Sequence, residues 1–202
     1  MGVKFDLEHN CFVFDFEHDG QSDIVKLTGS GYDVTAFGRC FYYGYEFNED
    51  VDGSVRSAFI KHVKFTENLK ENPDITHFVQ KAIDDLNHKI NLYDYDLVVM
   101  PESSSKINQY MLRYIYRFAQ PMLRKMELVK SLPETISFDM DGYQEILCQT
   151  IRRQNVLVID DVATSGSTLN EVLRALRILN EDNKITIFSL IGRKDLTIDA
   201  ME

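Results

Sequence analysis

The sequence predicts an α/β protein in which a parallel twisted sheet is flanked by helices and carries an N-terminal antiparallel β appendage, or hood. Three short apolar runs, at 96–100, 156–160 and 185–191, lack alternation and are typical of strands buried on both faces. Segments with apolar residues at helical spacing stand between these runs. Strand, loop and helix repeated in this order indicate a parallel sheet covered by helices.

The first fifty residues have a different pattern. The segment 12–16 alternates apolar and polar residues, while 24–28 and 34–47 are rich in β-branched and aromatic residues broken by glycines. We expect antiparallel hairpins here. The chain is therefore divided into an N-terminal β-rich hood or appendage at 1–50 and an α/β core at 51–202.

Helices are expected between the buried strands of the core. Ser54 is expected to cap a first helix, and clearer helices are expected over about 75–90, 106–118 and 169–179. The pattern of residues 126–152 does not indicate any one helix or strand. Ligands of such sheets bind at the carboxyl ends of the strands, so the loops after the first two buried strands are the places to look for a site.

Composition and charge exclude several classes of protein. The 202 residues are 44% apolar, as in ordinary globular domains, and 22 basic against 32 acidic residues give a net charge of −10. This acidity argues against a nucleic-acid partner bound over the whole surface. No apolar run approaches the ~20 residues of a membrane helix. Three distant cysteines without metal-ligand spacing, and a first segment without a secretory pattern, favour a reducing, cytoplasmic location.

The segment 156–176, VLVIDDVATSGSTLNEVLRAL, combines a buried strand, two carboxylates, a loop of small residues and a helix. Hydroxyl groups, a glycine and the free N–H groups of a helix N-terminus suit a phosphate. Carboxylates beside a phosphate need another partner, such as sugar hydroxyls or a divalent metal, so a ribose 5-phosphate satisfies both halves. The alternative is an ordinary helix cap after a strand that ends in two acids. The residues concerned are Asp160, Asp161, Ala163, Thr164, Ser165, Gly166, Ser167 and Thr168.

This segment resembles the signature of the type I phosphoribosyltransferases, in which an apolar strand, two acids and a Thr/Ser/Gly loop bind phosphoribosyl pyrophosphate. VLVIDDVATSGST matches that signature almost completely. The resemblance implies a type I phosphoribosyltransferase-like fold, with Asp160 and Asp161 as catalytic residues that hold the ribose hydroxyls. It implies that 163–168 cradles the 5-phosphate. It also implies Mg²⁺ as cofactor, reached by Asp160 or Asp161 directly or through water.

The loop after the first buried strand, PESSSKINQ at 101–109, corresponds by this resemblance to the pyrophosphate-binding loop. Its hydroxyls, one cation and the start of a helix supply donors and positive charge. Its acid is favourable only through a metal or as a cap for local N–H groups. The alternative is a serine-rich turn with a helix cap. The residues concerned are Glu102, Ser103, Ser104, Ser105 and Lys106.

Within the family, the segment 55–65 and the Asn108-Gln109 pair are similar to the competence-protein type of phosphoribosyltransferase, whose N-terminal zinc module is absent here. Thr164 stands where hypoxanthine-type members carry an acid, which puts that specificity in doubt. The loop that closes over the donor in many members is expected within 127–152, followed by Arg152 and Arg153, which are either solvated or bound to pyrophosphate.

The resemblance implies a pentosyltransferase that moves ribose 5-phosphate from phosphoribosyl pyrophosphate to a nitrogenous base or amine. One alternative is a non-catalytic regulatory or accessory protein that binds this donor or a nucleotide. A factor acting on single-stranded DNA is another, against which the net charge speaks. Phe41, Tyr42, Tyr43 and Tyr45 could stack a base, although an aromatic run in a strand is more typical of a core. The sequence leaves open whether the chain acts alone or as a homodimer.

Overall fold

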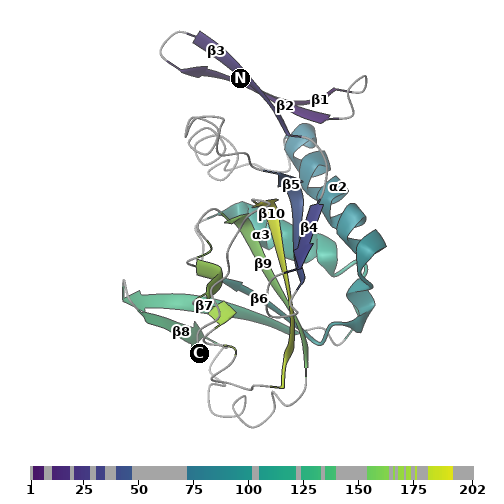
Figure 1. Ribbon diagram of the computed structural model, residues 1–202, viewed down its shortest axis with the longest axis vertical. Coiled ribbons are helices and arrows are strands. Elements are labelled where there is room, and N and C mark those ends of the chain that lie inside the picture. The colour runs from purple at the N-terminus through teal and green to yellow at the C-terminus, as the bar shows by residue number, and fades with distance from the viewer. Residues whose placement is uncertain are drawn as a thin grey trace.

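A computed structural model of the chain shows strands in two sheets (Figure 1), and helical residues pack on both faces of the larger one. The structure describes residues 2–6, 11–18, 21–27, 31–34, 40–46, 72–101, 105–121, 124–132, 135–139, 154–163, 166, 168–170, 172–173, 176 and 182–192. The helix expected after Ser54 lies outside these residues.

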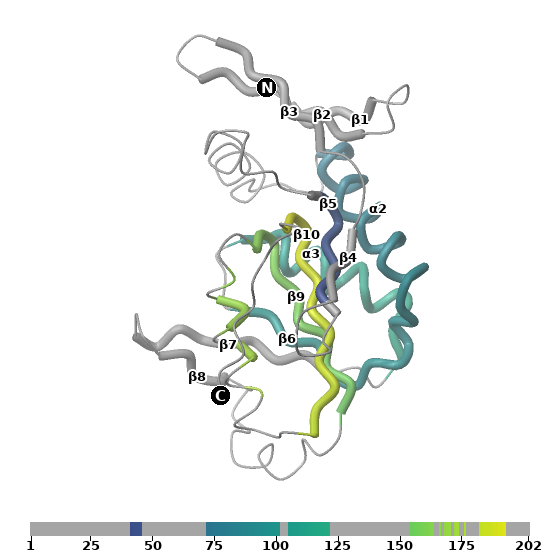
Figure 2. The backbone as a smooth tube through the Cα atoms, in the orientation of Figure 1, coloured from purple at the N-terminus to yellow at the C-terminus, as the bar shows by residue number. Residues whose placement is uncertain are grey.

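The larger sheet has seven strands in the order β4-β5-β10-β9-β6-β7-β8. These strands are β4 (Gly31–Val34), β5 (Cys40–Glu46), β6 (Leu97–Pro101), β7 (Arg124–Leu132), β8 (Thr135–Asp139), β9 (Asn155–Ala163) and β10 (Lys184–Gly192). Neighbours from β5 to β7 run parallel, while β4 and β8 pair antiparallel at the two edges. The predicted parallel sheet is confirmed, because its three buried strands β10, β9 and β6 lie side by side (Figure 2).

The first fifty residues contribute strands to both sheets. β1 (Gly2–Asp6), β2 (Cys11–His18) and β3 (Gln21–Leu27) form an antiparallel sheet of their own, in the order β1-β2-β3. β4 and β5 instead join the larger sheet, where Phe41 of β5 pairs with Ile187 of β10. The core sheet therefore draws on residues that the sequence assigned to the N-terminal appendage.

The range 127–152, in which a closing loop was expected, begins as a β-hairpin. β7 and β8 pair antiparallel, with Leu128 opposite Phe138. Residues 127–132 and 135–139 therefore belong to strands that extend the sheet, and the closing loop expected within this range stays a prediction. The remainder of the range, from residue 140 on, lies outside the described part of the chain.

Two described helices lie between β5 and β7 in the chain. α2 (Pro73–Lys89) begins where the Asn72 side chain accepts a hydrogen bond from the Ile75 N–H at 3.2 Å, and proline occupies its first turn. α3 (Lys106–Ile115) is shorter than the expected 106–118. The 3-10 turn η3 (Leu92–Asp94) connects α2 to β6. None of the helices in the described residues is both long enough and apolar enough to cross a membrane.

The core consists of two apolar clusters, one on each face of the larger sheet. Leu157 and Ile159 of β9 pack on one face with α2 and α3. Val156 and Val158 pack on the other face with the helical residues that follow β9, which are Leu169, Val172, Leu173 and Leu176. Because successive side chains alternate between two buried faces, the residues from Val156 to Ile159 must all be apolar, which explains this unbroken apolar run.

Candidate functional site

The two adjacent carboxylates lie in β9, near its carboxyl end. Asp160 is 7% exposed and Asp161 is 1% exposed, so both are taken out of bulk water. The backbone N–H of Asp161 donates to Oδ1 of Asp160 at 2.9 Å. Asp160 is in register with Ser189 of β10, whose hydroxyl donates to the Ile191 carbonyl at 2.7 Å. Burying a carboxylate costs free energy unless charged or polar groups compensate. Two buried carboxylates in a row therefore make the end of β9 a candidate binding site.

The side chains of β9 alternate between the two faces of the sheet up to Ile159. Val156 and Val158 pack with the helical residues that follow β9, whereas Leu157 and Ile159 pack with α2 and α3. Beyond the two carboxylates this alternation is reversed, since Val162 packs against the cluster of α2 and α3 and Ala163 belongs to the other cluster. Asp160 and Asp161 therefore stand where the alternation of β9 changes.

Gly166 begins the helix that follows β9. Its φ is 77°, in the left-handed region that favours glycine, and its carbonyl accepts the first helical hydrogen bond from the Asn170 N–H at 2.8 Å. Gly166 is therefore the N-cap residue, and the N–H groups of the first turn after it have no acceptor within the helix. Thr168 is half-buried in that first turn, and Ala163 ends β9 as a buried residue. The predicted loop residues Thr164, Ser165 and Ser167 lie outside the described positions.

The first turn of α3 forms the second part of the site. Ser105 is buried and caps the helix, since its Oγ accepts a hydrogen bond from the Ile107 N–H at 3.3 Å. Lys106 is exposed at the first helical position. The structure does not describe Glu102, Ser103 and Ser104, so their predicted contact with pyrophosphate stays a prediction.

Strand pairing brings the two helix starts together. β6 and β9 are neighbours without offset, with Val99 opposite Val158, so Pro101 at the end of β6 is level with Asp160. Both helices therefore start from the same edge of the sheet, and their N-terminal dipole ends face the same region. This is the carboxyl edge at which ligands of parallel sheets bind.

Buried polarity is concentrated at this carboxyl edge. Elsewhere the core of the described residues is apolar, and its buried polar or charged residues are Ser105, Asn108, Asp160, Asp161 and Ser189. All five belong to β9, to β10 beside it, or to the first turn of α3. Asn108 was not among the predicted site residues. It stands three positions before Met111 and four before Leu112, so a polar residue on the apolar stripe of a predicted helix was the available signal.

The two carboxylates suit a divalent cation only together with ligand oxygens. Within the residues that the structure describes, no group of three or more His, Cys, Asp or Glu side chains could hold a metal ion. Mg²⁺ is commonly bound through one or two carboxylates plus substrate phosphates and waters. Asp160 and Asp161 fit that requirement, with the remaining ligands supplied by a phosphorylated substrate.

The aromatic run of β5 belongs to the core. Phe41, Tyr43 and Tyr45 are at most 5% exposed, and Tyr42 is half-buried. The Tyr45 ring stacks on the Phe78 ring of α2, with 4.0 Å between ring centroids. The core interpretation of this run is confirmed, and its three buried rings have no free face on which to stack a base. Segment 55–65, Arg152 and Arg153 lie outside the described ranges.

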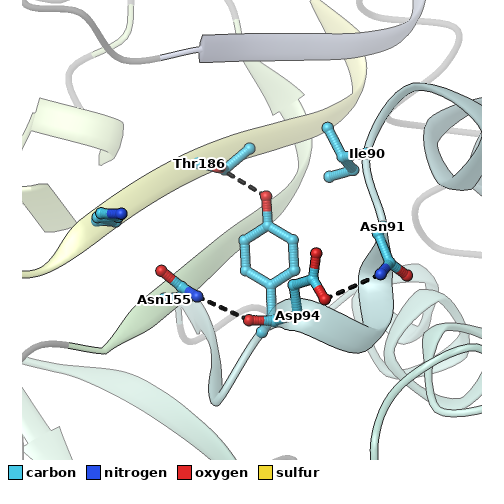
Figure 3. Close-up of a pocket in the computed structure, with 7 residues that line it drawn as sticks. Ile90, Asn91, Asp94, Asn155 and Thr186 are labelled. Carbon is cyan, nitrogen blue, oxygen red and sulfur yellow. Dashed lines mark hydrogen bonds between the residues drawn. The ribbon is translucent and has the colours of Figure 1, made fainter.

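A hollow lies at the opposite, amino edge of the sheet (Figure 3). The Tyr95 hydroxyl donates to Thr186 Oγ1 at 2.8 Å, Asn155 Nδ2 donates to the Asp94 carbonyl at 2.8 Å, and Asn91 Nδ2 donates to Asp94 Oδ1 at 2.9 Å. These lining groups bond to one another, so they join η3 to the starts of β9 and β10. We interpret this hollow as a structural junction.

No protein-family model and no curated protein matches the chain. Among solved structures, it is similar to a hypothetical protein from Neisseria gonorrhoeae with bound ppGpp (19% identity, TM-score 0.41, 64% of this chain and 73% of that chain). It is also similar to a hypoxanthine phosphoribosyltransferase from Staphylococcus aureus (16%, 0.41, 63% and 70%). A purine phosphoribosyltransferase from Pyrococcus horikoshii Ot3 is similar as well (15%, 0.43, 62% and 94%). All three TM-scores lie below 0.5, so these likenesses assign neither a substrate nor an activity to this chain.

Proposed function

We propose that the chain binds phosphoribosyl pyrophosphate with Mg²⁺ at the carboxyl edge of its sheet and transfers ribose 5-phosphate to a nitrogenous base or amine. The observation that carries this proposal is the sequence of groups at the end of β9. Buried Asp160 and Asp161 are followed within a few residues by Gly166, whose backbone has the left-handed conformation and which caps the next helix. Carboxylates for hydroxyls and a glycine-capped helix for a phosphate are the two halves of a ribose 5-phosphate site.

The two helix starts would divide the donor between them. The 5-phosphate would bind the backbone N–H groups after Gly166, where the helix dipole favours an anion. Asp160 is buried near the carboxyl end of the strand that leads into that helix, and its carboxylate would accept hydrogen bonds from the ribose hydroxyls. The pyrophosphate would bind at the start of α3, beside the Ser105 cap and the exposed Lys106. This division requires no net positive surface, which agrees with a chain of charge −10.

Transfer breaks the bond from ribose C1 to the pyrophosphate oxygen and forms a bond from C1 to the acceptor nitrogen. Pyrophosphate leaves with the electron pair of the broken bond, and the acceptor nitrogen loses a proton. When bound, Mg²⁺ would neutralise charge on the departing pyrophosphate. The contribution of Asp160 and of the capped helix is to fix the ribose so that C1 faces the acceptor, which lowers the entropic part of the barrier.

The test is to incubate the protein with phosphoribosyl pyrophosphate, Mg²⁺ and a panel of bases and amines, and to measure pyrophosphate release and donor binding. We expect release with one acceptor, and loss of both signals in Asp160→Asn combined with Asp161→Asn. Asp94→Asn is the matched control, since Asp94 is an exposed acid at the opposite edge. Donor binding without product across the panel would instead favour the accessory protein, and absence of donor and nucleotide binding would overturn both functions.

A further inference from the structure

The Asn108 side chain has an unusual environment. It is 2% exposed, and neither Oδ1 nor Nδ2 has a hydrogen-bond partner within the described structure. A buried amide without partners destabilises a protein, because it loses its bonds to water and gains none. An apolar side chain at this position of the apolar face of α3 would avoid that cost. The amide therefore suggests a hydrogen-bond partner that is not part of the protein.

We propose that Asn108 is a further ligand-binding residue of this site, whose amide N–H groups donate to the pyrophosphate end of the donor. This proposal rests on the proposed function. It assigns a role to the third residue of α3, which lies beyond the loop at 102–106, and names the ligand chemistry as a diphosphate anion.

The position of Asn108 in α3 directs its amide to the carboxyl edge. Asn108 is the third residue of the helix, after the Ser105 cap. Side chains of an α-helix lean toward its N-terminus, so the Asn108 amide lies over the first turn and toward Ser105, three residues earlier. The N–H groups of the first turn and the Asn108 amide could therefore donate to the same ligand.

The layer between α3 and the sheet is apolar. Ile107 and Met111 of α3 share a cluster with Leu157 and Ile159 of β9. Asn108 follows Ile107 in α3 and Asp161 stands two residues after Ile159 in β9, and both polar side chains are buried. A diphosphate that chelates Mg²⁺ would then accept hydrogen bonds from an amide of α3, while a carboxylate of β9 would bind the Mg²⁺ ion. These are the partners that a phosphate oxygen and a magnesium ion prefer.

The experiment is calorimetric titration with inorganic pyrophosphate and with phosphoribosyl pyrophosphate, both with Mg²⁺. Asn108→Leu keeps the branched side chain of four heavy atoms and removes both polar atoms, so we expect a melting temperature at or above that of the wild type. We expect its affinity for both ligands to fall about tenfold or more, as for a lost hydrogen bond to a charged group. Asn183→Leu is the control, because its Nδ2 is also buried without a partner in the described residues but lies at the amino edge.

A second variant and an NMR measurement on the wild type distinguish lost binding from a misfolded variant. Asn108→Asp is close to isosteric and places a carboxylate against the anion, so it should bind pyrophosphate still more weakly. In the wild type, the side-chain ¹⁵N–H signals of Asn108 should shift when pyrophosphate is added. Unchanged affinity in both variants, or unshifted amide signals, would overturn the role of Asn108 while leaving the donor site intact.

The outcomes separate this proposal from the proposed function. Wild-type protein that binds pyrophosphate but not phosphoribosyl pyrophosphate would contradict the proposed function, and the variants would still decide the role of Asn108. Wild-type protein that binds neither ligand would overturn both.

Discussion

The backbone N–H of Asn170 donates to the carbonyl of Gly166 at 2.8 Å, and Gly166 itself has a φ of 77°. Together these facts define where the helix after β9 begins and why glycine stands there. A residue with a Cβ is strained in this conformation, by about 1–2 kcal/mol. The start of this helix therefore depends on this one residue.

We predict that Gly166→Ala lowers the free energy of unfolding by about 1–2 kcal/mol and weakens binding of ribose 5-phosphate. Gly166→Asn is the informative partner, because asparagine tolerates the left-handed region better than alanine. It should recover most of the stability but not the affinity, since its side chain still keeps the phosphate away from the backbone. Denaturant unfolding and calorimetric titration measure the two effects. Full recovery of affinity in Gly166→Asn would limit Gly166 to a conformational role.

Gly44 of β5 allows α2 to pack closely on the sheet. A Cβ at this position would lie 2.6 Å from the Ala82 Cβ and 2.9 Å from the Leu190 carbonyl oxygen. Gly44→Ala should therefore destabilise the protein by about 1–3 kcal/mol, as overpacked core substitutions do. Urea unfolding of the variant measures this loss.

The double variant Gly44→Ala with Ala82→Gly tests the cause of that loss. Removing the Ala82 Cβ relieves the nearer contact but costs about 1 kcal/mol of helix propensity in α2. We expect the two substitutions to be less harmful together than the sum of the single effects. Strict additivity would show that the clash with α2 is not what destabilises Gly44→Ala.

Asp96 joins the starts of β6 and β9. Its Oδ2 accepts a hydrogen bond from the Asn155 N–H at 3.0 Å, and its Oδ1 accepts one from Gln120 Nε2 at 3.2 Å. Asp96→Ala should cost about 1–3 kcal/mol of stability, because it leaves partly buried donors unsatisfied. Since Asp96 lies at the amino edge, ligand affinity of the folded variant should not change. Thermal unfolding and donor titration check both parts, and weakened binding would show that the two edges are coupled.

Tyr45 is expected to make stability depend on alkaline pH. Its buried hydroxyl donates to the Phe78 carbonyl at 2.9 Å, and burial, with a smaller effect of the Asp85 carboxylate, raises the pKa of Tyr45 above its ordinary 10.0. The unfolded chain then loses this proton first as pH rises, so the contribution of Tyr45 to stability is present below pH 10.0 and falls above it.

Tyr45→Phe should lower the stability at neutral pH by about 0.5–1.5 kcal/mol, the contribution of one hydrogen bond. It should also reduce the decline above about pH 10, because phenylalanine does not titrate. Urea unfolding at neutral and alkaline pH measures both changes. Tyr93→Phe, at a ring that is 56% exposed, is the control and should leave the profile unchanged. An identical alkaline decline in wild type and Tyr45→Phe would refute this assignment.

Local patterns predicted most of the core elements. The apolar runs became β6, β9 and β10, and the helical spacing at 75–90 became α2 (Pro73–Lys89). These elements are readable because burial on one or two faces imposes a period on the residues themselves. Pairing between distant segments leaves no such period. The parallel contact of β5 with β10 joins Phe41 to Ile187 and was therefore missed.

The sequence by itself determined the buried strands, the main helices and the run of two acids, small residues and helix that suggests a phosphate ligand. Only the tertiary structure decided that the starts of α3 and of the helix after Gly166 lie at one edge, because that depends on β6 and β9 being neighbours in register. It also buried Asp160, Asp161 and Asn108 within an otherwise apolar core. The physical reason is that periodicity reports what each segment buries, while the choice of neighbouring strand fixes which polar groups meet.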